Sequence, residues 1–190
     1  MYKRQNLHQA VASLRRALEP ELAAGLPSRY LQVEEGTYTL VLPAGSWVDH
    51  EEFEERVRSL LKAENGDPEE WENVLALYQG DYLPEALYED WAALPRERLR
   101  ELYLRALERL SELHLKAGRH QEAAATARRI VEQDPWSEEA TRLLMQAHER
   151  SGDIPAALRA YEVHRERLQR DLGLPPREDL TALYERLRSR

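Results

Sequence analysis

The chain has 190 residues, 42% of them apolar and 33% charged, and it carries a formal net charge of −8. This length suits one sizeable domain or two small ones, and no apolar run approaches the length of a membrane span. The absence of Cys excludes disulfides and thiolate metal sites and fits a cytoplasmic protein. The first 45 residues hold five basic and four acidic side chains, whereas the rest hold 22 and 31. The long acidic part therefore suits protein partners better than nucleic acid.

The first part of the chain is predicted to be a helix followed by a hairpin. Apolar residues recur at spacings of four, three and four, which is one face of an α-helix. They are Leu7, Val11, Leu14 and Leu18. Pro20 ends this helix, because proline disfavours helical backbone in the residue before it. β-branched and aromatic residues around a glycine turn at 34–36 predict a hairpin over residues 30–41, and a Pro-Ala-Gly stretch at 43–45 predicts a boundary.

From residue 48 onward the pattern is helical throughout. Apolar stripes and turn residues predict helices over about 51–64, 68–78, 95–117, 121–132, 135–150, 154–171 and 179–187. We expect Pro95 to open the longest helix, because proline is favoured at the first helical position. Residues 80–91 form an irregular connection, which Tyr82 and Trp91 are expected to pin down. Trp71 is expected in the core.

The helical part contains an internal repeat. When the sequence is shifted by 34 residues, six positions carry the same residue in both copies. They are Ala106 and Ala140, Leu110 and Leu144, His114 and His148, Gly118 and Gly152, Ala123 and Ala157, and Glu132 and Glu166. A period of 34 residues is that of the tetratricopeptide helix pair. The fold class expected is therefore mostly α, with a tetratricopeptide-like helical repeat domain.

Several short stretches, taken in order, resemble the bacterial transcriptional activator domain. They are residues 76–84, Asp90-Trp91, 96–99, Asp134-Pro135, 138–140, 151–153, 156–158 and 171–176. The resemblance covers about residue 49 to the C-terminus. In the Streptomyces antibiotic regulatory protein family this domain follows a winged helix-turn-helix, so the resemblance implies a transcription activator of that type.

The first 45 residues resemble the end of an OmpR-type winged helix, with residues 6–18 as its recognition helix and 30–41 as its wing. The sheet and the first two helices of such a domain are missing. Residues 1–5 match an in-frame reading of a transposon-end sequencing adapter, so we interpret the chain as a truncated reading frame whose first five residues are not native. The expected domains are a partial winged helix over 1–45 and the repeat domain over 46–190.

The resemblance implies DNA contacts from the exposed face of this helix and from the wing. The candidate DNA-binding residues are Asn6, His8, Gln9, Ala12, Ser13, Arg15, Arg16, Arg29 and Thr37. Asparagine and glutamine pair with adenine, and arginine pairs with guanine or phosphate. The pattern alone also fits an ordinary amphipathic helix with a polar face.

No catalytic or metal site is predicted. His114 and His148 occupy equivalent repeat positions, too far apart for one metal ion, and the adjacent carboxylates of the helices are typical of solvated faces. We therefore expect no catalytic residue, no metal and no cofactor, and not an enzyme. The expected partners of the intact protein are promoter DNA, RNA polymerase and a second copy of the chain, with no membrane. The alternative is a stand-alone tetratricopeptide-type scaffold that binds proteins and no DNA.

Overall fold

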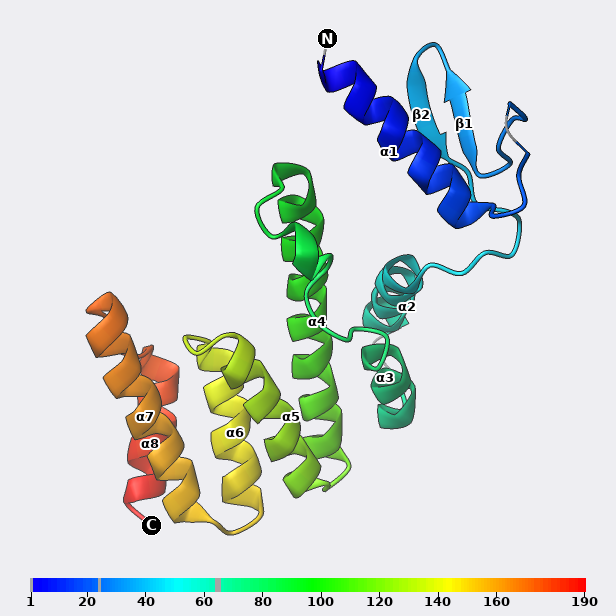
Figure 1. Cartoon of the computed structure of the whole chain (residues 1–190). Helices are drawn as coiled ribbons and strands as arrows, with labels where there is room; N and C mark the ends of the chain where they lie inside the picture. The colour runs from blue at the N-terminus through cyan, green and yellow to red at the C-terminus, as the bar shows by residue number, and fades with distance from the viewer. Residues whose placement is uncertain (1, 24, 64–65) are drawn as a thin grey trace. The chain divides into compact units, whose positions relative to one another are not determined.

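The computed structural model describes residues 2–23, 25–63 and 66–190. These residues form eight α-helices, a short 3-10 helix and one two-stranded hairpin (Figure 1). In chain order the elements are α1 (Tyr2–Leu18), β1 (Leu31–Glu34), β2 (Thr37–Leu40), α2 (Asp49–Ala63), α3 (Pro68–Leu75), η1 (Pro84–Ala86), α4 (Asp90–Lys116), α5 (His120–Gln133), α6 (Glu138–Arg150), α7 (Ile154–Leu172) and α8 (Glu178–Arg188). The prediction of a mostly α chain with one small hairpin is confirmed. The chain divides between Trp47 and Val48 into two compact units, each described by itself below.

The first unit consists of α1 and the hairpin. β1 and β2 are antiparallel, with Leu31 opposite Leu40 and Glu34 opposite Thr37. The two residues between the strands both have positive φ, 49° at Glu35 and 83° at the glycine after it. Two-residue hairpin turns of this kind match the twist of the strands, which explains why a glycine stands there.

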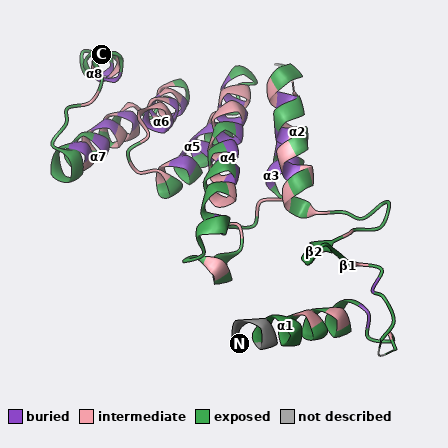
Figure 2. Cartoon of the chain, turned by 90° about the horizontal axis from the view of Figure 1, so that it is seen from above, coloured by how far each residue is buried: buried purple, intermediate pink, exposed green. Residues whose placement is uncertain are grey.

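Little apolar surface is buried in the first unit. Among its described residues Leu31 is the one apolar side chain that is buried. The stripe that the sequence assigns to one face of α1 is open to solvent, with exposed fractions of 48% at Leu7, 43% at Leu14 and 37% at Leu18 (Figure 2). Hydrophobic burial therefore contributes little to the stability of this unit.

In the second unit, α4, α5, α6 and α7 pack against one another in chain order (Figure 1). Helices α2 and α3 pack on α4, and α8 packs on α6 and α7. The largest core cluster joins α2, α3 and α4 around Phe53, Trp71 and Leu107, each at most 1% exposed. The expectation that Trp71 is a core residue is confirmed. Tyr161 and Tyr184 stack with their centroids 4.3 Å apart, where α7 meets α8.

Helices α4 and α6 end in the same way, 34 residues apart. The N–H of Arg119 donates to the carbonyl of His114, and the N–H of Asp153 donates to that of His148, both over 2.9 Å. The glycine before each donor is left-handed, with φ of 74° and 83°. Such an end satisfies carbonyls of the last helical turn, which otherwise have no partner. The sequence repeat thus coincides with a repeat of helix ends in the structure.

Helix α4 begins at Asp90, so the prediction that it opens at Pro95 is wrong. Pro95 has no N–H to donate to the carbonyl of Trp91, but this removes a single hydrogen bond near the start of a 27-residue helix. Ala92 lies in the turn before it and is completely buried, and its N–H donates to the carbonyl of Glu89 over 2.9 Å. The burial of this turn offsets the bond that proline cannot make.

Candidate functional site

The polar half of α1 carries seven of the nine candidate DNA-binding residues. Asn6, His8, Gln9, Ala12, Ser13 and Arg16 are exposed, and Arg15 is half-buried. The helical period places them on the side opposite the apolar stripe. The Nε of Arg16 donates to the carbonyl of Ala12 over 3.3 Å, one turn earlier. The structure therefore brings these residues together on one exposed helix surface.

The two wing candidates, Arg29 and Thr37, lie apart from this helix surface in the chain. Thr37 is exposed at the start of β2, opposite Glu34. Arg29 lies in the loop before β1, where its Nε is 3.3 Å from the carboxylate of Glu19. The Arg29 side chain is nevertheless 83% exposed, so it stays accessible.

Sequence reasoning missed the cluster that fastens the end of α1 to the hairpin. The carboxylate of Glu19 accepts a short hydrogen bond from the hydroxyl of Ser28 and another from the N–H of Arg29, over 3.1 Å. The bond from Ser28, followed by those from Arg29, holds the pKa of Glu19 below its ordinary value. Ser28 also accepts from the N–H of Leu31 over 2.9 Å. Four residues thus fix the direction in which the hairpin leaves the loop.

The two repeat histidines have different neighbours. His114 is 2% exposed, and its Nε2 lies 3.5 Å from the carboxylate of Glu72. His148 is half-buried, and its Nε2 lies 3.3 Å from a guanidinium nitrogen of Arg128. Burial lowers the pKa of both rings. No group of three or more His, Cys, Asp or Glu in the described part of the chain is placed to hold a metal ion.

A search of the described residues for membrane spans finds no helix with the length and apolar character to cross a bilayer.

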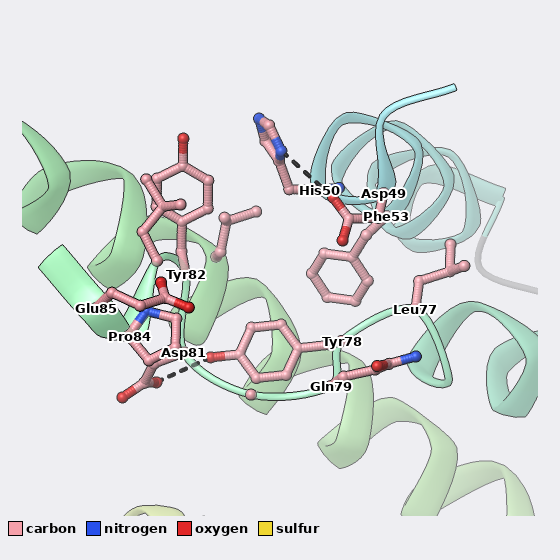
Figure 3. Close-up of a pocket in the computed structure, with 13 residues that line it drawn as sticks. Asp49, His50, Phe53, Leu77, Tyr78, Gln79, Asp81, Tyr82, Pro84 and Glu85 are labelled. Atoms are coloured by element: carbon pink, nitrogen blue, oxygen red, sulfur yellow. Dashed lines mark hydrogen bonds and ion pairs between the residues drawn. The ribbon is translucent and has the colours of Figure 1, made fainter. Parts of the chain in front are cut away.

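The second unit contains a cavity of about 680 Å³ between the start of α2, the segment after α3 and the middle of α4 (Figure 3). Its lining residues are Asp49, His50, Phe53, Leu77, Tyr78, Gln79, Gly80, Asp81, Tyr82, Leu83, Pro84, Glu85 and Leu99. Nine of these thirteen come from the continuous segment 77–85. The sequence predicted a helix to residue 78 and an irregular connection over 80–91, whereas α3 ends at Leu75, and it gave no sign of a cavity.

Aromatic rings from α2 and from the segment 77–85 pack against one another in the wall of this cavity. The ring centroids of Phe53 and Tyr78 are 5.5 Å apart, and those of His50 and Tyr82 are 5.0 Å apart, edge to face. Figure 3 shows the ring of Phe53 directed from α2 towards that of Tyr78. The hydroxyl of Tyr78 donates to Asp81 over 3.3 Å. Burial, together with this carboxylate, raises the pKa of Tyr78 to about 12, so the hydroxyl keeps its proton at neutral pH.

One arginine of α4 holds the wall of the cavity in place. The guanidinium of Arg96 donates to the carbonyls of Tyr82 over 3.0 Å, Ala86 over 3.1 Å, Leu83 over 3.3 Å and Leu87 over 3.4 Å. Five N–H donors in a fixed planar fork suit arginine to satisfy several carbonyls of one turn. Four backbone oxygens of this connection thereby gain a donor, and those of Leu83 and Ala86 accept a backbone N–H as well.

The expectation for the aromatic residues of this connection is right for one and wrong for the other. Tyr82 is half-buried and packs against the main core cluster. Trp91 is 62% exposed, so it does not pin the connection; the contacts of Arg96 do so. Leu87, Tyr88 and Leu94, close to Trp91 in the sequence, are exposed as well.

Comparisons with known proteins identify one matching family and similar proteins. Residues 48–188 match the family model described as the bacterial transcriptional activator domain. The regulatory protein AfsR of Streptomyces griseus is 34% identical over 114 residues, which are 60% of this chain and 12% of that protein. A structure described as Mycobacterium tuberculosis EmbR in complex with low affinity phosphopeptide is similar in fold, with a TM-score of 0.75 and 25% identity. That match covers 98% of this chain and 50% of the EmbR chain.

The helical second unit and these relatives define a class, the bacterial transcriptional regulators with an α-helical activator domain. The chain belongs to the bacterial transcriptional activator domain family. The resemblance read from short stretches after residue 49 is thus confirmed. The chain spans about an eighth of AfsR and half of the EmbR chain.

Proposed function

We propose that this chain comes from a transcription activator that binds promoter DNA through a winged helix and contacts RNA polymerase through its helical domain. The observation that carries this proposal is the match of residues 48–188 to the activator-domain family. The similarity to EmbR supports it further, because that match covers 98% of the chain and therefore includes most of α1 and the hairpin.

In this proposal, the first 45 residues are the C-terminal part of the winged helix, and residues 1–5 are not native. Residues 6–18 of α1 are the recognition helix, and the hairpin β1–β2 is the wing. The exposed polar half of α1 would enter the major groove with its N-terminal residues, while the hairpin would contact the DNA backbone. The exposed stripe of Leu7, Leu14 and Leu18 fits a helix that packs against further parts of a winged helix in the parent protein.

Residues 46–190 form a tetratricopeptide-like domain in this proposal. The sequence repeat of 34 residues and the equal spacing of the ends of α4 and α6 support this assignment. Stacked helix pairs present an extended surface for other proteins, and the excess of acidic residues after residue 45 favours protein over DNA as their partner. We assign to this domain the contacts with a second copy of the chain and with RNA polymerase, in the cytoplasm.

A second candidate function is a stand-alone protein-binding scaffold. The specific observation that favours it is the small buried apolar surface of the first unit, where Leu31 is the one buried apolar side chain among the described residues. A DNA-reading helix needs a rigid base to hold its side chains in register with the bases.

The experiment that separates the two is DNA binding by the parent protein, expressed from its complete reading frame. Fluorescence anisotropy with labelled fragments from upstream of its own gene would show tight, salt-dependent binding to one fragment and weak binding to a scrambled fragment of equal length. Equal weak binding to both fragments would support the scaffold instead.

A further inference from the structure

The cavity beside α2 has the size and the walls of a small-molecule site. Its volume of about 680 Å³ lies within the range of about 300–1,000 Å³ that ligand pockets occupy. The half-buried side chains of Leu77, Tyr78 and Tyr82 form apolar parts of its wall. Phe53 and Leu99 also line it but are almost completely buried. A mainly apolar lining with a few polar groups at fixed places is what such sites have in common.

The charged groups at this cavity have one sign. Asp49, Asp81 and Glu85 line it, and none of its described lining residues is Lys or Arg. Glu85 has no hydrogen-bond or ion-pair partner among the described residues, and Figure 3 shows it on the same side of the cavity as Tyr82. Arg96, which is not among the lining residues, directs its guanidinium at four backbone carbonyls of the wall. The cavity itself therefore favours a positively charged guest.

The wall of the cavity is held in an unusual backbone conformation. Leu83 lines the cavity and has φ of 49° and ψ of 66°, the left-handed region that a branched side chain seldom adopts. Such a conformation costs of order 1–3 kcal/mol and persists only where the surroundings impose it, often at ligand sites. Here the bonds from Arg96 to Leu83 and its neighbours impose it. The site is therefore formed before any guest arrives, which reduces the cost of binding.

We propose that this cavity binds a small organic ammonium ion that carries apolar substituents. The half-buried side chains of Tyr78 and Tyr82 would contact the substituents, and the ring of Tyr82 would attract the charge, as aromatic rings do for quaternary ammonium groups. Asp81 and Glu85 would balance the charge at the mouth of the site. The guest would contact α2, α4 and the segment 77–85 simultaneously. Its binding would therefore reduce the motion of these elements relative to one another.

The test is a titration of the 190-residue chain, followed by backbone amide NMR, with choline and with its neutral carbon isostere 3,3-dimethylbutan-1-ol. We expect choline to shift the amide signals of residues 50 and 77–85 in a saturable way. The isostere should bind about tenfold more weakly, since it retains the shape and loses the cation–aromatic attraction. Equal affinity for the two probes would overturn the proposal, as would saturable shifts confined to other helices.

Two variants and a control test the residues. Tyr82→Leu should weaken choline binding about tenfold, because it removes a ring and keeps an apolar side chain of similar reach. Glu85→Gln should weaken it about two- to fivefold. Glu97→Gln removes the same charge from α4 outside the cavity and should leave the affinity unchanged. An effect of Glu97→Gln as large as that of Glu85→Gln would overturn the site assignment.

A third titration tests whether the guest is a free ammonium ion or a lysine side chain of a partner protein. A lysine-containing peptide with blocked ends is titrated under the same conditions. Binding of this peptide together with absence of binding by choline would overturn the proposal and indicate a peptide-docking surface. Choline binding by the cavity does not depend on DNA binding by the parent protein. The titration and the anisotropy experiment can therefore succeed or fail separately.

Discussion

The backbone of Gly66 lies directly against the indole of Trp71. A Cβ placed on residue 66 would come 2.4 Å from Nε1 and 3.0 Å from Cδ1 of that ring. Trp71 is completely buried in the cluster that joins α2, α3 and α4, so the ring has little room to give way. The position of residue 66 before α3 therefore depends on a contact that a residue with a side chain would not allow.

Gly66→Ala should lower the free energy of unfolding by about 1–3 kcal/mol, the usual cost of forcing extra atoms into a packed core. Urea denaturation followed by circular dichroism measures this loss. In the background of Trp71→Phe, which removes the contacting part of the ring, the loss caused by Gly66→Ala should shrink. An equal loss in both backgrounds would mean that the backbone of residue 66, and not its contact with Trp71, carries the effect.

Arg96→Ala should free the segment 82–87 from α4. Removal of this side chain takes one donor from each of four carbonyls, of which those of Leu83 and Ala86 keep a backbone donor. We therefore expect a loss of about 1–3 kcal/mol in unfolding free energy and faster amide exchange across this segment. Arg98→Ala, two residues later, removes a partly exposed ion pair with Glu54, which keeps Arg58 as a partner, and should cost less than about 1 kcal/mol. A larger effect for Arg98→Ala than for Arg96→Ala would contradict the role given to Arg96.

The buried ring of His114 should make stability depend on pH. Burial lowers its pKa below the ordinary value of 6.5, and the charge of Arg119 adds to this, whereas Glu72 and Glu122 oppose it. Because the folded protein binds the proton less readily than the unfolded chain, this stability is fully present above pH 6.5 and is lost as the pH falls below it. The difference in unfolding free energy between wild type and His114→Gln should therefore change between pH 8 and pH 5. A constant difference would contradict this.

Two substitutions on α1 test the DNA-binding surface in the parent protein. Gln9→Ala should weaken binding to the specific fragment by about 1–3 kcal/mol and relax the preference for one base. Arg16→Ala should weaken binding to all fragments and reduce the dependence of affinity on salt, as loss of a phosphate contact does. Arg159→Ala, an exposed arginine on α7, is the control and should change neither quantity. Loss of binding through Arg159→Ala alone would move the DNA surface to the second unit.

The sequence predicted those parts of the fold that depend on neighbouring residues. The ends of α4 and α6 follow from one glycine each, because a left-handed residue closes the last turn of the same helix. The hairpin follows from the turn at Glu35 and Gly36 in the same manner. Each of these signals lies within a few residues of the structure that it determines.

The parts that the sequence did not predict depend on contacts between distant residues. Arg96 bonds to carbonyls up to 14 residues earlier, and Glu19 accepts from residues nine and ten positions later. No periodicity marks such pairs. The cavity likewise requires α2 and the segment 77–85 to lie side by side. The apolar pattern of α1 predicts a buried face but does not indicate which residues would cover it. The start of α4 was misplaced because the burial of Ala92 outweighs the local preference of Pro95.

The most direct test of the central claim is transcription activation by the helical domain alone. Residues 48–190 form a compact unit with their own core, so they are fused to a DNA-binding protein of known operator and placed upstream of a reporter gene. If this domain recruits RNA polymerase, reporter transcription should rise above that given by the DNA-binding protein alone. A folded fusion that occupies its operator and leaves transcription unchanged would contradict the account.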